Sequence, residues 1–315
     1  MTKYRMPKLT LILAVHNGGK SFQECLESII PHLHCIDSLF VSINKGSAQE
    51  DDVVTWKNFL QQQPDVQHTC LIQKKFLSAK QHAAIIYPKL LETYKGMEDI
   101  YYLILCHDDM LMPNFSETVK DILPKLNAQT TVNPARAFYK DTFSKENHTF
   151  TFYGLLAHQD GISRENFISA DIDRNYITNI SGIILHRTVY ENAMKWCLRT
   201  VYGYRSEYLL LASKGVKKIM GTQEPLVGIR LHSASGSSLA PTWKIRIDEY
   251  IYLLYMYFTT NDPFLREKLR RRCTIVGLAA NPVKELAFQF YKRVLKKILP
   301  KHVLTLLKSR LQQWR

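Results

Sequence analysis

The sequence has few of the features that mark specialised classes of protein. Its six cysteines are scattered and form no Cys-x-x-Cys pair, which argues against a zinc site or a disulfide framework and favours a reducing cytoplasm. No apolar run is long enough to cross a bilayer, and residues 1–10 lack the apolar core of a secretory signal. Charged residues make up 22% of the chain and hydrophobic residues 46%, which is typical of a globular protein rather than a disordered one.

Acidic residues are scarce in the last fifty positions, and this scarcity explains the basic character of the chain. The net charge is +14, and residues 266–315 contain 14 lysines and arginines against only Glu267 and Glu285. The rest of the chain is therefore close to neutral. An amphipathic pattern over 284–299 favours either a helix on an anionic membrane surface or a core-facing helix with a solvated basic face.

Apolar strands alternate with helices over the first third of the chain. Strands are predicted in the runs 8–17, 38–44, 68–73 and 99–106, with helices after Ser21 and over 50–62 and 78–94. Ser21 and Glu24 have the spacing of a capping box for the first of these helices. Because the strands are apolar throughout, we expect a parallel sheet covered by helices on both faces.

The middle of the chain is less regular, and it contains no internal repeat and no low-complexity linker. Further elements are predicted as a helix near 114–127, a strand over 177–185, helices over 188–196 and 206–215, and a strand within 224–238. Gly215 has the position of a C-cap for the helix that precedes it.

Polar side chains follow three of the predicted strands. Asn17 and Asn44 lie at the carboxyl ends of the first two, and the adjacent pair Asp108 and Asp109 comes after the very apolar run 101–106. In a parallel sheet these positions share the edge at which ligands bind. Two neighbouring carboxylates need compensation, which a divalent cation supplies. The alternative is a pair of solvated loop aspartates, one of them capping the helix introduced by Pro113.

Five segments, in order, resemble elements of the family 2 glycosyltransferases: LILAVHNGGKSFQECLESI, FVSINKGS, FLSAKQHAAI, YLILCHDDMLMP and IRLHSASGSS. The resemblance implies an α/β, GT-A-like fold with a Rossmann-like, mostly parallel sheet flanked by helices. It implies a glycosyltransferase domain over 1–240, with a nucleotide-sugar half at 1–113 and an acceptor half at 114–240. The region 241–315 would be a basic, amphipathic helical extension.

The resemblance also implies a donor site and a metal site. Residues implied at the donor are Val15, His16, Asn17, Asn44, Lys80, His107, Asp108 and Arg230. Residues implied to hold Mg²⁺ or Mn²⁺ are Asp108, Asp109 and His232, although a hydrogen-bonded loop histidine is the alternative for the last. The chain departs from the family where Cys106 replaces the first aspartate of the DxD motif, and where Asn44 and Lys45 replace an acidic pair.

An inverting transferase needs a general base for the acceptor hydroxyl. Glu207 is the carboxylate in the matching context, and a first-turn glutamate favoured by the helix dipole is the alternative. The segment 179–187 resembles the acceptor side of the family, with Gly182 allowing close approach of a substrate.

The resemblance and the basic end together imply a sugar transferase of bacterial surface polysaccharide synthesis, such as lipopolysaccharide or capsule. It would act on a lipid-linked or oligosaccharide acceptor, in the cytoplasm at the inner face of the membrane. The alternatives are a module that binds an anionic surface or nucleic acid through the basic end, and a degenerate transferase that acts as a scaffold. We expect no nucleic-acid partner, because no nucleic-acid-binding motif is present. A nicotinamide-dependent oxidoreductase is disfavoured because HNGGKS lacks the GxGxxG spacing.

Overall fold

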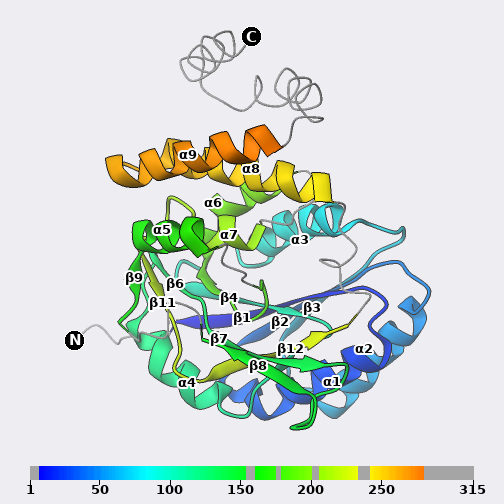
Figure 1. Cartoon of the computed structure of the whole chain (residues 1–315). Coiled ribbons are helices and arrows are strands. Elements are labelled where there is room, and N and C mark those ends of the chain that lie inside the picture. The colour runs from blue at the N-terminus through cyan, green and yellow to red at the C-terminus, as the bar shows by residue number, and fades with distance from the viewer. Residues whose placement is uncertain (1–6, 154–159, 175–178, 201–205, 233–241, 280–315) are drawn as a thin grey trace.

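The computed structural model describes residues 7–153, 160–174, 179–200, 206–232 and 242–279. In this part of the chain an eight-stranded sheet has the order β3-β2-β1-β4-β10-β6-β11-β9, and a four-stranded sheet has the order β5-β12-β7-β8 (Figure 1). The strands of the larger sheet are β1 (Lys8–Val15), β2 (Ser38–Ile43), β3 (His68–Ile72), β4 (Ile100–Cys106), β6 (Thr130–Val132), β9 (Ile162–Ser163), β10 (Ile184–His186) and β11 (Lys218–Met220). Those of the smaller sheet are β5 (Met110–Leu111), β7 (Ala135–Lys140), β8 (His148–Phe152) and β12 (Pro225–Leu231).

The first four strands of the large sheet run parallel, as their apolar sequences predict. β1 pairs in parallel with both β2 and β4, and β2 pairs in parallel with β3. The register places Val15 beside Ile43 and Ala14 beside Cys106. Three strands therefore end at one edge of the sheet, and the loops that follow them meet there.

Helices cover both faces of the large sheet, because each strand is apolar on both sides. In Figure 1, α1, α2 and α4 lie on one face, and α3, α5, α6 and α7 lie on the other with α8 and α9 outside them. The helices are α1 (Gly19–Ile29), α2 (Gln49–Gln62), α3 (Ala79–Thr93), α4 (Phe115–Ile122), α5 (Arg164–Arg174), α6 (Arg187–Cys197), α7 (Ser206–Leu211), α8 (Thr242–Thr259) and α9 (Pro263–Ala279). Short 3₁₀ turns, Ile30–Cys35 and Leu123–Lys125, continue α1 and α4.

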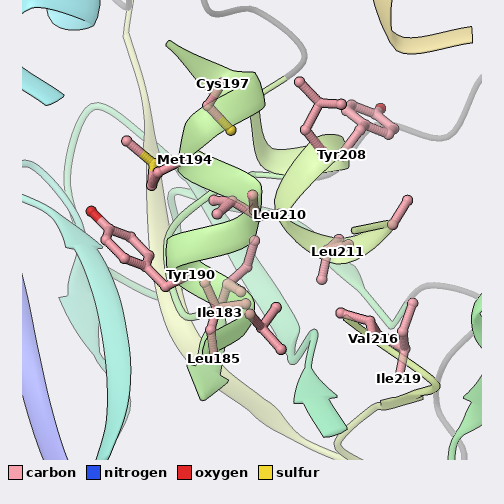
Figure 2. Packing of buried hydrophobic residues seen from close by; sticks show 14 of the residues in the cluster. Ile183, Leu185, Tyr190, Met194, Cys197, Tyr208, Leu210, Leu211, Val216 and Ile219 are labelled. Carbon is pink, nitrogen blue, oxygen red and sulfur yellow. The ribbon is translucent and has the colours of Figure 1, made fainter. Parts of the chain in front are cut away.

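The core on the second face joins the sheet to the helices that follow residue 240. Figure 2 shows side chains of α6 and α7 packed with Ile183, Leu185 and Ile219. The same buried cluster contains Tyr252 of α8 and Leu265 of α9. The helical region predicted after residue 240 thus begins with two helices whose inner faces share the core of the α/β domain.

Two local predictions are wrong. α1 begins at Gly19 with Gly18 as its N-cap and has no side-chain cap, so Ser21 and Glu24 form no capping box. The structure instead places a capping box at the start of α3, between Ser78 and Gln81. α7 ends at Leu211, before Gly215, because the chain turns there toward β11.

Other predictions hold only in part. The strand expected over 177–185 is the short β10, Ile184–His186. The tail pattern over 284–299 lies outside the described residues. Among the helices that are described, none combines the length and the apolarity that crossing a bilayer requires.

Candidate functional site

The turn after β1 is held in place by a buried carboxylate from α2. Asn17 has a positive φ of 51° and accepts a hydrogen bond from Ala48 N–H through its Oδ1 (3.1 Å). The N–H groups of Gly18 and Gly19 both donate to the carboxylate of Asp52 (3.1 and 2.7 Å), which is fully buried. Asp52 therefore supplies the negative charge at the start of α1 that the sequence assigned to a capping box.

The turn packs closely against the loop after β2. A Cβ on Gly46 would lie 2.1 Å from Asn17 Oδ1, so any larger residue would require the Asn17 side chain to move from its present position. Val15 is fully buried in the core, and its carbonyl accepts from Asn44 N–H (2.9 Å). The side chain of Val15 is thus turned away from the edge where Asn17 lies exposed.

Asn44 is buried and bonded within the protein. Its Nδ2–H donates to the carbonyl of Leu77 (2.7 Å), and its Oδ1 accepts from Leu77 N–H and Lys45 N–H (both 3.0 Å). The side-chain amide of Asn44 therefore links the end of β2 to the segment before α3 through two hydrogen bonds with Leu77. Only 2% of Asn44 is exposed, so the contact that the resemblance implied between its side chain and a base has no open surface to use.

Histidines gather beside this turn. His16 packs edge-to-face against Phe76 (5.4 Å between ring centroids), which is 62% exposed. His107 Nδ1 lies 3.2 Å from the carbonyl oxygen of Ala14, and burial together with the nearby His107 lowers the pKa of His16. His82 is buried with its Nε2 2.7 Å from Ser42 Oγ, and burial lowers the pKa of His82 to about 4. Burial therefore favours the neutral form of the His16 and His82 rings.

Asp108 and His232 meet although 124 positions separate them. The imidazole Nε2 of His232 lies 2.9 Å from Asp108 Oδ2, and both side chains are partly exposed. Asp108 follows β4 of the large sheet, whereas His232 follows β12 of the small one. The two sheets thus bring together two residues that the sequence analysis named as metal ligands.

Asp109 has a different environment from its neighbour. Only 3% of it is exposed, and it accepts hydrogen bonds from Ser181 Oγ–H (2.5 Å) and from Arg230 N–H (3.0 Å). Burial and the charge of Asp108 raise the pKa of Asp109 to about 8, against the opposing effect of these two donors and Arg136. Asp109 is therefore a buried carboxyl group that links two other segments of the chain and lies beside the possible ligands.

Cys106 completes a group of three possible ligands. Its Sγ and carboxylate oxygens of Asp108 and Asp109 all lie within 4.8 Å of one another. Burial, reinforced by Asp109 and Asp108, raises the pKa of the Cys106 thiol well above its ordinary value. A neutral thiol therefore stands where the glycosyltransferases that the sequence resembles have their first aspartate. Carboxylate oxygens suit both Mg²⁺ and Mn²⁺, whereas an imidazole nitrogen is more typical of transition-metal ions. Of the two implied cations, the donor set of Asp108 and His232 therefore fits Mn²⁺ better.

The side chains of Arg230 and Lys80 both donate hydrogen bonds to other segments of the chain. The guanidinium of Arg230 donates to Glu24 and to the carbonyls of Asp108 (3.3 Å) and Asp141 (2.9 Å), and it stacks over Phe143. The ammonium of Lys80 donates to the carbonyl of Thr200, and burial lowers the pKa of Lys80. Both cations therefore hold segments together at the edge of the site.

Two predicted features of the acceptor side have different outcomes. Glu207 lies in the first turn of α7, and the position of its side chain is outside the described part of the structure. Gly182 has a φ of 86°, and a Cβ there would lie 2.5 Å from Val227 Cγ2 and 2.9 Å from Pro134 Cγ. Protein atoms fill this space, so Gly182 serves close packing rather than the approach of a substrate.

Sequence reasoning missed four residues that build the site: Glu24, Asp52, Arg136 and Ser181. Asp52 looks like any acidic residue in a first helical turn, and Arg136 lies in a strand with no motif around it. Asp52 bonds to the turn after β1, and Arg136 bonds to the turn at 179–181, so the partners that matter for the site are remote in sequence. Ser181 lies in the segment 179–187, which the sequence analysis selected because of Gly182, and this segment was the only signal that pointed toward Ser181.

Comparisons with known proteins support the fold. No family model matches the chain, and no curated protein matches it. Among solved structures, S. aureus TarS is similar over 85% of this chain and 43% of its own, with 8% identity and a TM-score of 0.55. GalNAc-T7, solved with UDP, GalNAc and Mn²⁺, is similar over 93% of this chain and 59% of its own, with 10% identity and a TM-score of 0.50. The chain spans about half the length of these proteins, and the likeness shows that it has the GT-A fold.

Proposed function

We propose that this protein is an inverting glycosyltransferase that moves a sugar from a nucleotide-sugar donor to an acceptor hydroxyl with the help of Mg²⁺ or Mn²⁺. The GT-A fold and the order of the five sequence motifs support this class of reaction. The observation that carries the proposal is the 2.9 Å approach of Asp108 and His232 at the edge where β1, β2 and β4 end. Two ligands from separate sheets at this edge are what a cation beside a donor diphosphate needs.

The chemistry explains why these residue types are required. Glycosyl transfer breaks the bond between the anomeric carbon and the diphosphate, and negative charge grows on the leaving diphosphate. A bound divalent cation would stabilise that charge as a Lewis acid. In this proposal Asp108 and His232 hold the cation, and Glu207 accepts the proton of the acceptor hydroxyl.

The donor would lie along the loops after β1 and β2. The exposed turn at Asn17 and the ring pair of His16 and Phe76 border this region, so we place the nucleotide there. Since Asn44 is bonded to backbone groups, the base would be recognised by other contacts. Arg230 and Lys80 would contribute positive charge from the edge of the site while keeping their bonds to the protein.

Binding and turnover test the proposal separately. A panel of nucleotide-sugars with and without Mn²⁺ should contain one that raises the melting temperature, because a ligand that prefers the folded state stabilises it. Replacing the proposed base in Glu207→Gln should lower turnover on that donor by about 100-fold or more, since general-base catalysis contributes this much. Donor binding should survive the change.

Glu117→Gln is the matched control for this experiment, because Glu117 is also a first-turn glutamate, in α4. It should leave turnover unchanged. Full turnover in Glu207→Gln would disprove the assignment of the base. Failure of every nucleotide-sugar to bind would disprove the proposed function itself.

The basic end of the chain suggests where the reaction occurs. We propose peripheral binding to an anionic membrane during synthesis of a surface polysaccharide, on a lipid-linked or oligosaccharide acceptor. The exposed Arg266, Arg270 and Arg271 of α9 and the 71% exposed Phe264 support such a contact. Co-sedimentation with phosphatidylglycerol vesicles should fall with added salt and be absent with phosphatidylcholine vesicles. Equal binding to both lipids would contradict it.

A further inference from the structure

The buried carboxylate of Asp109 joins the two segments that flank the proposed metal site. Its Oδ2 accepts from the Ser181 hydroxyl, and its Oδ1 accepts from the backbone N–H of Arg230. Since the side chain is 97% buried and bonded at both oxygens, it is anchored between these donors. A metal ligand needs at least one oxygen turned toward the cation, and Asp108 next to it is the more exposed of the two carboxylates.

The first of these segments is the turn that contains Ser181. The hydroxyl of Ser181 also accepts from Cys106 N–H (2.9 Å), so it connects the end of β4 to Asp109. The fully buried guanidinium of Arg136 anchors the backbone of the turn. It donates to the carbonyls of Ser181 (2.9 Å) and Asn179 (2.7 Å), and also to Asn133 Oδ1 (2.8 Å) and the carbonyl of Pro134 (2.9 Å). Ser181 is thereby held rigidly at the place where Asp109 needs a donor.

The second segment is the end of β12, which carries His232. Arg230 N–H bonds to Asp109, and the Arg230 guanidinium bonds to the carbonyl of Asp108. His232 follows only two residues later, so the position of its ring relative to Asp108 depends on where Arg230 is held. Asp109 thus lies between the end of β4 and the end of β12.

We propose that Asp109 is a positioning residue that, together with Ser181, holds Asp108 and His232 at the spacing a divalent cation needs. This inference rests on the proposed function. Two adjacent ligands with bonds of about 2.1 Å at right angles are about 3.0 Å apart, and Asp108 and His232 are already 2.9 Å apart. The network therefore assembles the pair before a cation binds, so binding requires little rearrangement.

The inference predicts that Ser181, which touches neither proposed ligand side chain through its hydroxyl, controls cation affinity through Asp109. Groups that orient metal ligands typically change metal affinity by about 10–100-fold when they are removed. Ser181→Ala and Asp109→Asn should each weaken binding within this range. Ser181→Ala removes one of the two donors to Asp109, and Asp109→Asn leaves a single acceptor oxygen for both donors, so the two changes disturb the same contacts. The double variant should therefore bind no more weakly than the weaker single variant, within about twofold.

The experiment measures Mn²⁺ binding in the presence of UDP by the electron paramagnetic resonance signal of free Mn²⁺. It compares the wild-type chain with Asp109→Asn, Ser181→Ala and the double variant. Asp108→Asn serves as the ligand control and should abolish measurable binding. Ser38→Ala is the matched serine control, because Ser38 bonds to Thr10 and Tyr94 at the opposite end of the strands. It should bind Mn²⁺ like the wild type.

Several results would overturn the inference. Unchanged affinity in Ser181→Ala would show that the hydroxyl plays no positioning role. Loss in Asp109→Asn as complete as in Asp108→Asn, or strictly additive losses in the double variant, would make Asp109 an independent ligand. If Asp109→Asn does not fold, the Mn²⁺ affinities of Ser181→Ala and Ser38→Ala are sufficient to test the positioning role. Failure of the wild-type chain itself to bind Mn²⁺ with UDP would contradict the metal site of the proposed function. The other outcomes concern only the variants, so they test the positioning role of Asp109 separately.

Discussion

The guanidinium of Arg136 offers the sharpest test of how the site is built. It is 0% exposed and donates to four acceptors, and three of these hydrogen bonds are fully buried. Arg136→Met keeps much of the side-chain length but removes every donor. The carbonyl of Ser181, the carbonyl of Pro134 and Asn133 Oδ1 would each lose a buried partner, and the turn at 179–182 would lose its anchor.

The magnitude follows from these three buried acceptors. A buried acceptor left without a donor costs about 1–3 kcal/mol, so three cost at least about 3 kcal/mol. Removing a buried charge recovers part of its desolvation penalty, so the net loss of unfolding free energy should be about 3–5 kcal/mol. The melting temperature should fall by about 6–10 °C, at roughly 2 °C per kcal/mol for a chain of this size.

Urea unfolding followed by circular dichroism measures this loss of free energy. Arg271→Met is the matched control, because the side chain of Arg271 is 75% exposed and pairs with Glu267 on the surface of α9. The control should change the free energy of unfolding by less than about 0.5 kcal/mol. A loss below about 1 kcal/mol in Arg136→Met would show that the turn is held without these hydrogen bonds.

Two further predictions concern the donor side of the site. Burial lowers the pKa of His82 from 6.5 to about 4, so the folded state favours the neutral ring. The free energy of unfolding is therefore unaffected by protonation of His82 above pH 6.5, and it falls as the pH is lowered from 6.5 toward 4. Acidification from pH 7 to 4.5 should therefore destabilise the wild type by about 2 kcal/mol more than His82→Gln in urea unfolding, and an equal loss in both would contradict this. Asn44→Ala should cost about 1–3 kcal/mol in the same assay, because Leu77 loses a partner for both its N–H and its carbonyl; a neutral effect would show that this loop is held by other contacts.

The order of elements was predictable from local patterns. Apolar runs of strand length alternating with amphipathic helices predicted β1 to β4 and the helices between them. Polar residues directly after such strands were expected at one edge, because parallel strands point their carboxyl ends the same way. The register of Ala14 with Cys106 and of Val15 with Ile43 meets this expectation.

The partners of the polar residues could not be predicted in the same way. Glu24 has the spacing of a capping box with Ser21, yet it pairs with Arg230, 206 positions away. The start of α1 is satisfied by Asp52, from the next helix. A local motif predicts a local contact, and here tertiary packing placed a stronger charged partner beside the same groups.

The amino-acid sequence is enough to locate the polar residues at the strand ends, and therefore the edge where a site can form. Which of these residues are open to a ligand and which are bonded within the protein depends on how the chain folds. Asp108 and Asp109 are adjacent in the chain, but one approaches His232 while the other is buried against Ser181 and Arg230. The physical reason is that burial and hydrogen bonding depend on segments far away in sequence, which meet only when the two sheets pack together.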